Sequence, residues 1–109
     1  MRILITGANG MLGRTLRREL ARHTLIPTDL PEGDITSPAG FDALVAAARP
    51  DAVIHCAAMT AVDRCESEPE LAWKLNAFGS ANVAAACYRH RVRLIAISTD
   101  YVFDGRDPE

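Results

Sequence analysis

Short apolar segments alternate with longer amphipathic ones along this chain. The apolar segments, which are typical of buried strands, cover residues 2–6, 23–29, 52–57 and 92–98. The amphipathic segments predict helices over residues 11–22, from Ser37-Pro38 to Pro50, and from Pro69 to about His90. Because helices that connect short apolar strands act as right-handed crossovers, the pattern predicts an α/β fold with a parallel sheet.

Each predicted helix has one apolar face. Residues at helical spacing form these faces: Leu12, Leu16 and Leu20 in the first helix; Phe41, Leu44, Val45 and Ala48 in the second; Leu71, Leu75, Phe78 and Val83 in the third. Ser37 is the expected N-cap of the second helix, with Pro38 at its first position. Pro27 makes the segment of residues 23–29 the weakest of the predicted strands.

Composition and charge narrow the function classes. The 109 residues, 49% of them hydrophobic, are enough to bury the core of one domain or of part of one. The net charge of −2 gives no electrostatic footprint for nucleic acid, and no apolar run approaches the roughly 20 residues of a membrane span. The arginines of the first helix are interpreted as its solvated face, with an anion-binding patch as the alternative: Arg14, Arg17, Arg18 and Arg22.

The cysteines and the start of the chain favour a cytoplasmic location. Cys56, Cys65 and Cys87 are an odd number without a C-x-x-C pair, so neither a disulfide framework nor a zinc clip is expected. His55 and Cys56 are adjacent, and neighbours on a strand point to opposite faces, which argues against a metal or thiolate site. The chain enters a strand at once, without the pattern of a secretory signal.

A glycine-spaced turn follows the first strand and leads directly into a helix. Gly7, Gly10 and Gly13 lie three residues apart in this turn. In such a unit the first glycine allows a tight turn, the second lets the backbone approach a pyrophosphate, and the third lets the helix pack on the strand. The N–H groups and partial positive charge of the helix start then face the phosphates. The spacing predicts a dinucleotide site, with a plain glycine turn as the alternative.

Two aspartates extend the predicted site. Asp29 lies at the end of the second strand, sixteen residues beyond Gly13, where a carboxylate can bind the adenosine ribose and repel a 2′-phosphate. This favours NAD over NADP, although Arg14, just after the glycine turn, could tolerate the phosphate. Asp34 and Ile35 come next and could flank the adenine, with a solvated loop aspartate as the alternative.

Several stretches of the chain together resemble one enzyme family. They are GANGMLG at residues 7–13, Asp34-Ile35-Thr36, AAMTAVD at 57–63, ESEPE at 66–70, Asn76, and STDYVF at 98–103. In this order and at these separations the chain is similar to the dTDP-4-dehydrorhamnose reductases of the extended short-chain dehydrogenase/reductase family. The resemblance implies a Rossmann-like doubly wound parallel sheet, truncated after about the fifth strand, and an incomplete NAD(P)-binding domain over residues 1–109.

The same resemblance implies a role for several residues. Those expected at the cofactor are Gly10, Met11 and Leu12 at the pyrophosphate, Asp29 at the ribose, Asp34 and Ile35 at the adenine, and Ala57, Ala58 and Thr60 on the path to the nicotinamide. Thr99 would be the catalytic hydroxyl and, with Asp100, would contact the sugar nucleotide. Asn76 would help to hold the active-site architecture. A cap at the end of a strand remains the alternative for Thr99.

The reaction implied by the resemblance is the reduction of the 4-keto group of a dTDP-6-deoxyhexulose by NADH or NADPH, which gives dTDP-L-rhamnose. A tyrosine protonates the developing alkoxide and a lysine lowers the pKa of that tyrosine, within a Tyr-x-x-x-Lys motif. Tyr88 and Tyr101 are each followed at this spacing by a residue other than lysine, and Lys74 is the only lysine. Residues 1–109 alone, without the substrate-binding C-terminal part of the family, are therefore expected to bind cofactor without turnover.

Two other interpretations stay open. One is a non-catalytic regulatory relative, such as a methionine adenosyltransferase beta subunit, which turnover of a dTDP-ketosugar would distinguish. The other is a different nucleotide-sugar epimerase or dehydratase, in which paired serines more often stand where Ser98 and Thr99 stand here. The long helix from Pro69 is a candidate homodimer surface, and the last strand is expected to expose an apolar face.

Overall fold

The computed structural model describes residues 1–30, 32–58 and 66–97 of the chain. The strands are β1 (Arg2–Thr6), β2 (Thr24–Pro27), β3 (Ala52–His55) and β4 (Arg93–Ala96). The helices are α1 (Met11–Glu19), α2 (Pro38–Ala48), α4 (Pro69–Ala72), the π-helix η1 (Trp73–Phe78) and α5 (Gly79–Arg89). The predicted α/β alternation is confirmed, because each of the four described strands lies within one of the four segments predicted as strands. The resemblance implied about five strands.

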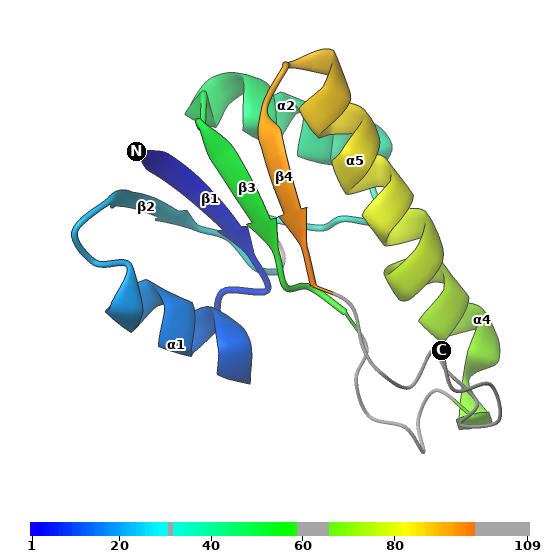
Figure 1. Ribbon diagram of the computed structural model, residues 1–109. Helices are drawn as coiled ribbons and strands as arrows, with labels where there is room; N and C mark the ends of the chain where they lie inside the picture. The colour runs from blue at the N-terminus through cyan, green and yellow to red at the C-terminus, as the bar shows by residue number, and fades with distance from the viewer. Residues whose placement is uncertain (31, 59–65, 98–109) are drawn as a thin grey trace, which may run out of the picture.

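The strands form one parallel sheet in the order β2-β1-β3-β4 (Figure 1). In its register, Leu4 lies opposite Ile26 and Val53, and Thr6 lies opposite His55. The chain runs from β1 to β2 at one edge of the described sheet, crosses to β3 on the other side of β1, and continues to β4 at the opposite edge. The carboxyl ends of β1, β2 and β3 therefore meet at one edge, which is where open parallel sheets bind ligands.

Helices cover both faces of the sheet, α1 on one side and α2 and α5 on the other (Figure 1). On the α1 face, Ile3, Ile5, Ala8 and Ile54 form a buried cluster against which Leu16 and Leu20 pack. On the other face, a larger cluster joins the sheet to α2 and α5: Leu4, Ile35, Phe41, Val45, Val53, Val83, Ala86 and Cys87. The alternation along β1 thus divides its side chains between two cores.

Two of the predicted apolar positions are exposed. Leu12 is 41% exposed because it lies in the first turn of α1, at the edge where the strands end. Phe78 is 64% exposed. The prediction that Phe78 faces the core assumed α-helical spacing from Pro69 to His90. The chain instead passes through η1, whose wider turns rotate the side chains away from their α-helical positions. The predicted single helix is therefore three successive segments.

Several element ends differ from the predicted ones by a few residues. α1 ends at Glu19 rather than Arg22, and β3 ends at His55 rather than Ala57. Pro27 is the last residue of β2 and pairs with Ile5, which is compatible with its missing N–H because β2 is an edge strand of the described sheet. At the other edge, Ile95 and Ile97 are about half exposed, as expected for the last strand.

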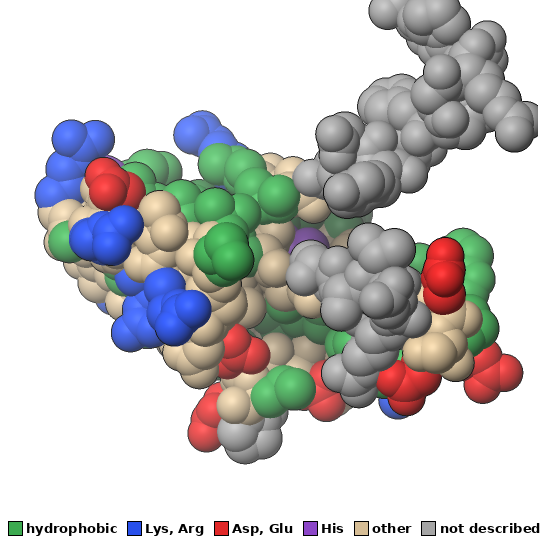
Figure 2. All heavy atoms as spheres, turned by 90° about the horizontal axis from the view of Figure 1, so that it is seen from below, with side chains coloured by type: hydrophobic (Ala, Val, Ile, Leu, Met, Phe, Trp, Pro, Cys, Tyr) green, Lys and Arg blue, Asp and Glu red, His purple; other side chains and the backbone are tan. Residues whose placement is uncertain are grey.

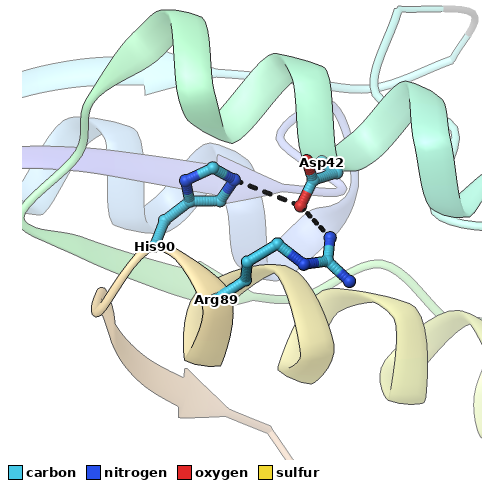
Figure 3. A network of polar contacts seen from close by, with 3 residues as sticks. All are labelled: Asp42, Arg89 and His90. Atoms are coloured by element: carbon cyan, nitrogen blue, oxygen red, sulfur yellow. Dashed lines mark hydrogen bonds and ion pairs between the residues drawn. The ribbon is translucent and has the colours of Figure 1, made fainter.

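Polar contacts hold α2 at its start and near its middle. The hydroxyl of Ser37 accepts a hydrogen bond from the N–H of Gly40 at 3.2 Å, so the predicted N-cap is confirmed. Near the middle of α2, the carboxylate of Asp42 accepts hydrogen bonds from Arg89 and from Nε2 of His90, which joins α2 to the end of α5 (Figure 3). Desolvation opposes ionisation of Asp42, but the hydrogen bond and charge of Arg89, helped by His90, lower the pKa of the carboxyl. No helix in the described part of the chain is long and apolar enough to cross a bilayer.

Candidate functional site

An open pocket lies at the carboxyl ends of the first three strands, the edge onto which Figure 2 looks. Its walls come from the turn after β1, the segment after β2 and the segment after β3, with one side chain from η1. The lining residues are Gly7, Gly10, Asp29, Leu30, Gly33, Asp34, Ile35, Cys56, Ala57, Ala58 and Leu75. Most of the Lys and Arg side chains visible in Figure 2 gather on the side of α1, and most of the Asp and Glu side chains lie elsewhere on this face.

Two of the three spaced glycines are required by the protein's own packing. Gly7 has a φ of +62°, and a Cβ there would lie 2.8 Å from the N atom of Ala57. A Cβ on Gly13 would overlap the carbonyl oxygen of Gly7 and lie 2.7 Å from Cα of Ala8. Gly7 therefore allows the turn to approach the segment after β3, and Gly13 allows the start of α1 to pack closely on the turn after β1, in agreement with the close packing predicted for the third glycine.

Gly10 is different, because little in the protein occupies the space beside it. A Cβ there would meet the carbonyl oxygen of Gly7 at 3.3 Å and, among the described residues beyond its two chain neighbours, no other atom within 4 Å, and the residue is exposed at the pocket. Gly10 is also the N-cap of α1, in an extended conformation that any residue adopts. Backbone strain does not explain a glycine at this position, and the single tight contact with Gly7 would need only a small shift, so close approach of a ligand to the backbone is the stronger physical reason.

The start of α1 favours an anion in this space. Gly10 caps the helix without a side-chain hydrogen bond, and the first turn carries no acidic residue. The first N–H groups of a helix have no partner within the helix and carry its partial positive charge. Met11 and Leu12, which were predicted to contact a pyrophosphate, are the first two residues of α1 and are exposed. The residues present therefore fit a bound phosphate group.

Asp29 joins the end of β2 to the glycine turn. Its Oδ2 accepts a hydrogen bond from the N–H of Asn9 at 3.0 Å, and its Oδ1 accepts one from the N–H of Leu30 at 2.8 Å. A carboxylate has about four acceptor positions, so two remain for the hydroxyls of a ribose. Arg17 lies close to this group, since its Nη1 donates to Oδ1 of Asn9 at 3.4 Å. The sequence predicts a solvated helix face for Arg17, with an anion-binding patch as the alternative.

Asp34 and Ile35 form the wall of the pocket between β2 and α2. Oδ1 of Asp34 accepts hydrogen bonds from the hydroxyl of Thr36 at 2.6 Å and from the N–H of Thr36 at 2.9 Å, and these bonds lower the pKa of the carboxyl. The Ile35 side chain is buried, and its carbonyl accepts a hydrogen bond from Nδ2 of Asn82 at 2.9 Å. Asp34 is held by a local contact with Thr36 and Ile35 by a long-range contact from α5, so this wall is pre-formed.

The wall after β3 contains Cys56, Ala57 and Ala58. Burial raises the pKa of the thiol of Cys56, and likewise that of Cys87, which does not favour a thiolate. The described residues contain no group of three or more His, Cys, Asp or Glu side chains placed to bind a metal ion. Thr60, Thr99 and Asp100, which were also predicted at the site, lie outside the described residues, as do Cys65 and Tyr101.

Sequence reasoning missed several residues of this site. Leu30 and Leu75 line the pocket, and a Cβ on Gly33 would lie 2.8 Å from Cβ of Thr28, so Gly33 is also required by packing. Leu30 and Gly33 lie between Asp29 and Asp34, both predicted, and that proximity was the available signal. Leu75 had no such signal, because it comes from a helix distant in sequence.

Comparisons with known proteins agree with this geometry. The RmlD substrate binding domain family matches residues 1–109. The dTDP-4-dehydrorhamnose reductase of Streptomyces griseus is 48% identical over 106 residues, which cover 95% of this chain and 35% of that protein. The chain thus spans about a third of the length of this curated relative.

Two crystal structures of similar proteins show the same fold. A dTDP-4-dehydrorhamnose reductase from Clostridium acetobutylicum superposes with a TM-score of 0.93 at 48% identity, covering 100% of this chain and 40% of that one. The dTDP-4-dehydrorhamnose reductase of Bacillus anthracis, in complex with NADP, superposes with a TM-score of 0.92 at 44% identity, covering 99% of this chain and 39% of that one.

Proposed function

This chain belongs to the RmlD substrate binding domain family, and from this premise we propose that residues 1–109 form the NAD(P)-binding domain of a dTDP-4-dehydrorhamnose reductase. The observation that carries the proposal is Gly10, beside which the protein leaves space at the start of α1. The nearby carboxylate of Asp29 suits an adenosine ribose. The reductase from Bacillus anthracis, whose structure contains NADP, supports the same class of cofactor.

Each wall of the pocket has a role in this proposal. The N–H groups at the start of α1, from Met11 and Leu12, bind the pyrophosphate, while Asp34 and Ile35 hold the adenine. Ala57 and Ala58, continued by Thr60, line the path of the nicotinamide half. The bound dinucleotide supplies the hydride that reduces a 4-keto group of a dTDP-6-deoxyhexulose.

We propose that NADH binds more tightly than NADPH, by a small factor. The carboxylate of Asp29 repels a 2′-phosphate, and it cannot move away easily because Asn9 and Leu30 hold both of its oxygens. Arg17 lies on the other side of Asn9 and provides a positive charge that compensates in part. The ratio of the two affinities therefore reports the balance between Asp29 and Arg17.

Turnover requires groups beyond those that bind the cofactor. In the proposed reductase Thr99 hydrogen-bonds the carbonyl oxygen and Asp100 contacts the sugar nucleotide. The Tyr-x-x-x-Lys pair that protonates the alkoxide does not occur in residues 1–109. Loss of a general acid removes about 10²–10⁴-fold of rate. Residues 1–109 alone therefore bind cofactor without measurable reduction of the sugar, and a cytoplasmic location and a homodimer through the helix from Pro69 stay predictions.

Isothermal titration of the 109-residue chain with NADH and with NADPH tests the proposal. We expect saturable binding with one site per chain, and the absence of binding by either dinucleotide would contradict it. NADH oxidation in the presence of a dTDP-4-keto-6-deoxyhexose then tests turnover. Rapid oxidation by residues 1–109 would contradict the assignment of proton transfer to an absent Tyr-x-x-x-Lys pair, whereas binding without oxidation is the expected result.

A further inference from the structure

The hydroxyl of Thr6 is the centre of a buried polar cluster at the end of β1. Its Oγ1 lies 2.8 Å from Nδ1 of His55, 3.0 Å from the N atom of Cys56 and 3.1 Å from the N atom of Ala57. Thr6 is fully buried and His55 is 4% exposed. On the other side of the ring, Nε2 of His55 lies 3.0 Å from Oγ of Ser80 in α5. The cluster therefore connects β1, β3, α5 and the pocket wall.

The hydrogen bonds that Thr6 accepts determine which ring nitrogen of His55 carries the proton. A hydroxyl has two acceptor positions and one proton. The N–H groups of Cys56 and Ala57 fill both acceptor positions, so the Thr6 proton must be donated to Nδ1 of His55. Nδ1 then carries no proton, and the proton of the neutral ring is on Nε2, from which it is donated to Ser80. Burial lowers the pKa of His55, which agrees with a neutral ring.

The hydrogen bonds from Cys56 and Ala57 to Thr6 take the place of ladder hydrogen bonds at the pocket wall. The ladder between β1 and β3 ends with the pair of Thr6 and His55, so the N–H groups of Cys56 and Ala57 lie beyond it. Gly7, the next residue after Thr6, approaches the same backbone so closely that a Cβ there would lie 2.8 Å from the N atom of Ala57. The hydroxyl of Thr6 and the lack of a side chain at Gly7 together determine the position of the wall after β3.

We propose that Thr6, His55 and Ser80 form a positioning relay for the pocket wall of Cys56 and Ala57, in which His55 in its Nε2–H form orients the Thr6 hydroxyl toward both backbone N–H groups. The relay rests on the proposed function in so far as the wall positions the nicotinamide half of the cofactor. His55 and Thr6 do not touch that cofactor in this proposal; they act through the backbone of Ala57.

The matched variants Thr6→Val and Thr6→Ser separate the hydroxyl from the shape of the side chain. Valine keeps the branched shape and takes the acceptor away from two half-buried N–H groups, whereas serine keeps the hydroxyl. Because the wall of Cys56 and Ala57 then loses the acceptor that holds it in position, we expect Thr6→Val to weaken NADH binding by about 10- to 100-fold. Thr6→Ser should recover most of the affinity. Ser80 is half-buried in α5, at the far end of the relay, and Ser80→Ala should weaken NADH binding by a smaller factor. This variant tests the relay if Thr6→Val does not fold.

A spectroscopic measurement tests the relay without any cofactor. Long-range ¹H–¹⁵N spectra of the full chain distinguish the two tautomers of a neutral histidine, and we expect the Nε2–H form for His55 and a changed Nδ1 signal in Thr6→Val. An Nδ1–H form or a charged ring at neutral pH would overturn the relay. Equal NADH affinity of folded Thr6→Val and Thr6→Ser would overturn it too. Absence of NADH binding by the unchanged protein would instead contradict the proposed function, while the tautomer would still decide the relay.

Discussion

Replacing Gly10 by aspartate should separate ligand binding from folding. Gly10 is the N-cap of α1 in an extended conformation, and within the described part of the chain a side chain there would meet, beyond its two chain neighbours, the carbonyl oxygen of Gly7 at 3.3 Å. Aspartate is among the best N-cap residues, and a negative charge at the start of a helix is favourable. The same carboxylate would point into the space assigned to the pyrophosphate. One substitution therefore improves the helix and obstructs the proposed ligand.

The two effects have opposite signs and different sizes. At the N-cap, exchanging glycine for aspartate is expected to change the free energy of unfolding by about 0 to 1 kcal/mol in the stabilising direction, reduced by the tight contact with Gly7. Two like charges about 4 Å apart near a protein surface repel by about 4 kcal/mol. Even half of this repulsion, with the steric overlap, corresponds to a loss of at least about 30-fold in affinity.

Matched substitutions in the same turn are the controls. Gly10→Ser adds a capping side chain without the charge, so its NADH affinity should lie between those of the wild type and Gly10→Asp. Gly13→Ala would push a Cβ into backbone atoms of Gly7 and Ala8. Overpacking of about 1–3 kcal/mol there exceeds the gain of about 1 kcal/mol from alanine in a helix, so Gly13→Ala should lower stability.

The assay pairs urea unfolding with calorimetric titration of NADH for each variant. We expect Gly10→Asp to unfold at the same urea concentration as the wild type or a higher one, and to lose NADH binding. Wild-type affinity in folded Gly10→Asp would refute the assignment of the pyrophosphate to this turn. Strong destabilisation by Gly10→Asp would refute the claim that the space beside Gly10 is not needed by the protein.

Three further predictions follow from charged and polar contacts. Asp29→Asn should raise the affinity for NADPH relative to NADH, and a ratio unchanged from the wild type in calorimetric titration would contradict the role of Asp29. Burial lowers the pKa of His55, so the folded protein favours the neutral ring, and the stability that this provides is present above an unfolded pKa of about 6.5. This stability is lost as the pH falls through the lower folded pKa. In urea unfolding, the free energy of unfolding should therefore fall by at most about 1.4 kcal/mol per pH unit in this range. That slope should be smaller in His55→Gln. Asp42→Asn should lower stability at low salt, and the difference should shrink with added NaCl because the contacts of Asp42 to Arg89 and His90 lie at the surface.

Local patterns explain why much of the fold was predicted correctly. The apolar run of β1 and the glycine turn after it are signals within one short stretch, and both occur where expected. Ser37 and Pro38 mark the start of α2 by their own chemistry. Asp29 was predicted at the site because the end of the second strand has a fixed place in a dinucleotide-binding unit, and it lines the pocket.

Long-range contacts explain what the sequence did not predict. Thr6 and His55 are 49 residues apart, and His55 and Ser80 are 25 apart, so no periodicity in one segment reveals their cluster. Asn82 reaches the carbonyl of Ile35 across a separation of 47 residues. The π-helix η1 was missed because apolar spacing near 3.6 residues does not register a wider turn inside a longer helix.

The alternation along β1 has a consequence for misfolding. Ile3 and Ile5 point to the α1 face, whereas Leu4 points to the α2 and α5 face, where Thr6 meets His55. If β1 paired with β3 one residue out of register, every side chain of the strand would move to the opposite face. The hydroxyl that holds Ala57 would then move to the α1 face in the same event that exchanges apolar side chains between the two cores. A chain with this register shift would lose the pocket wall together with the correct packing of its core. Dinucleotide binding would therefore occur only in chains whose strands are paired correctly.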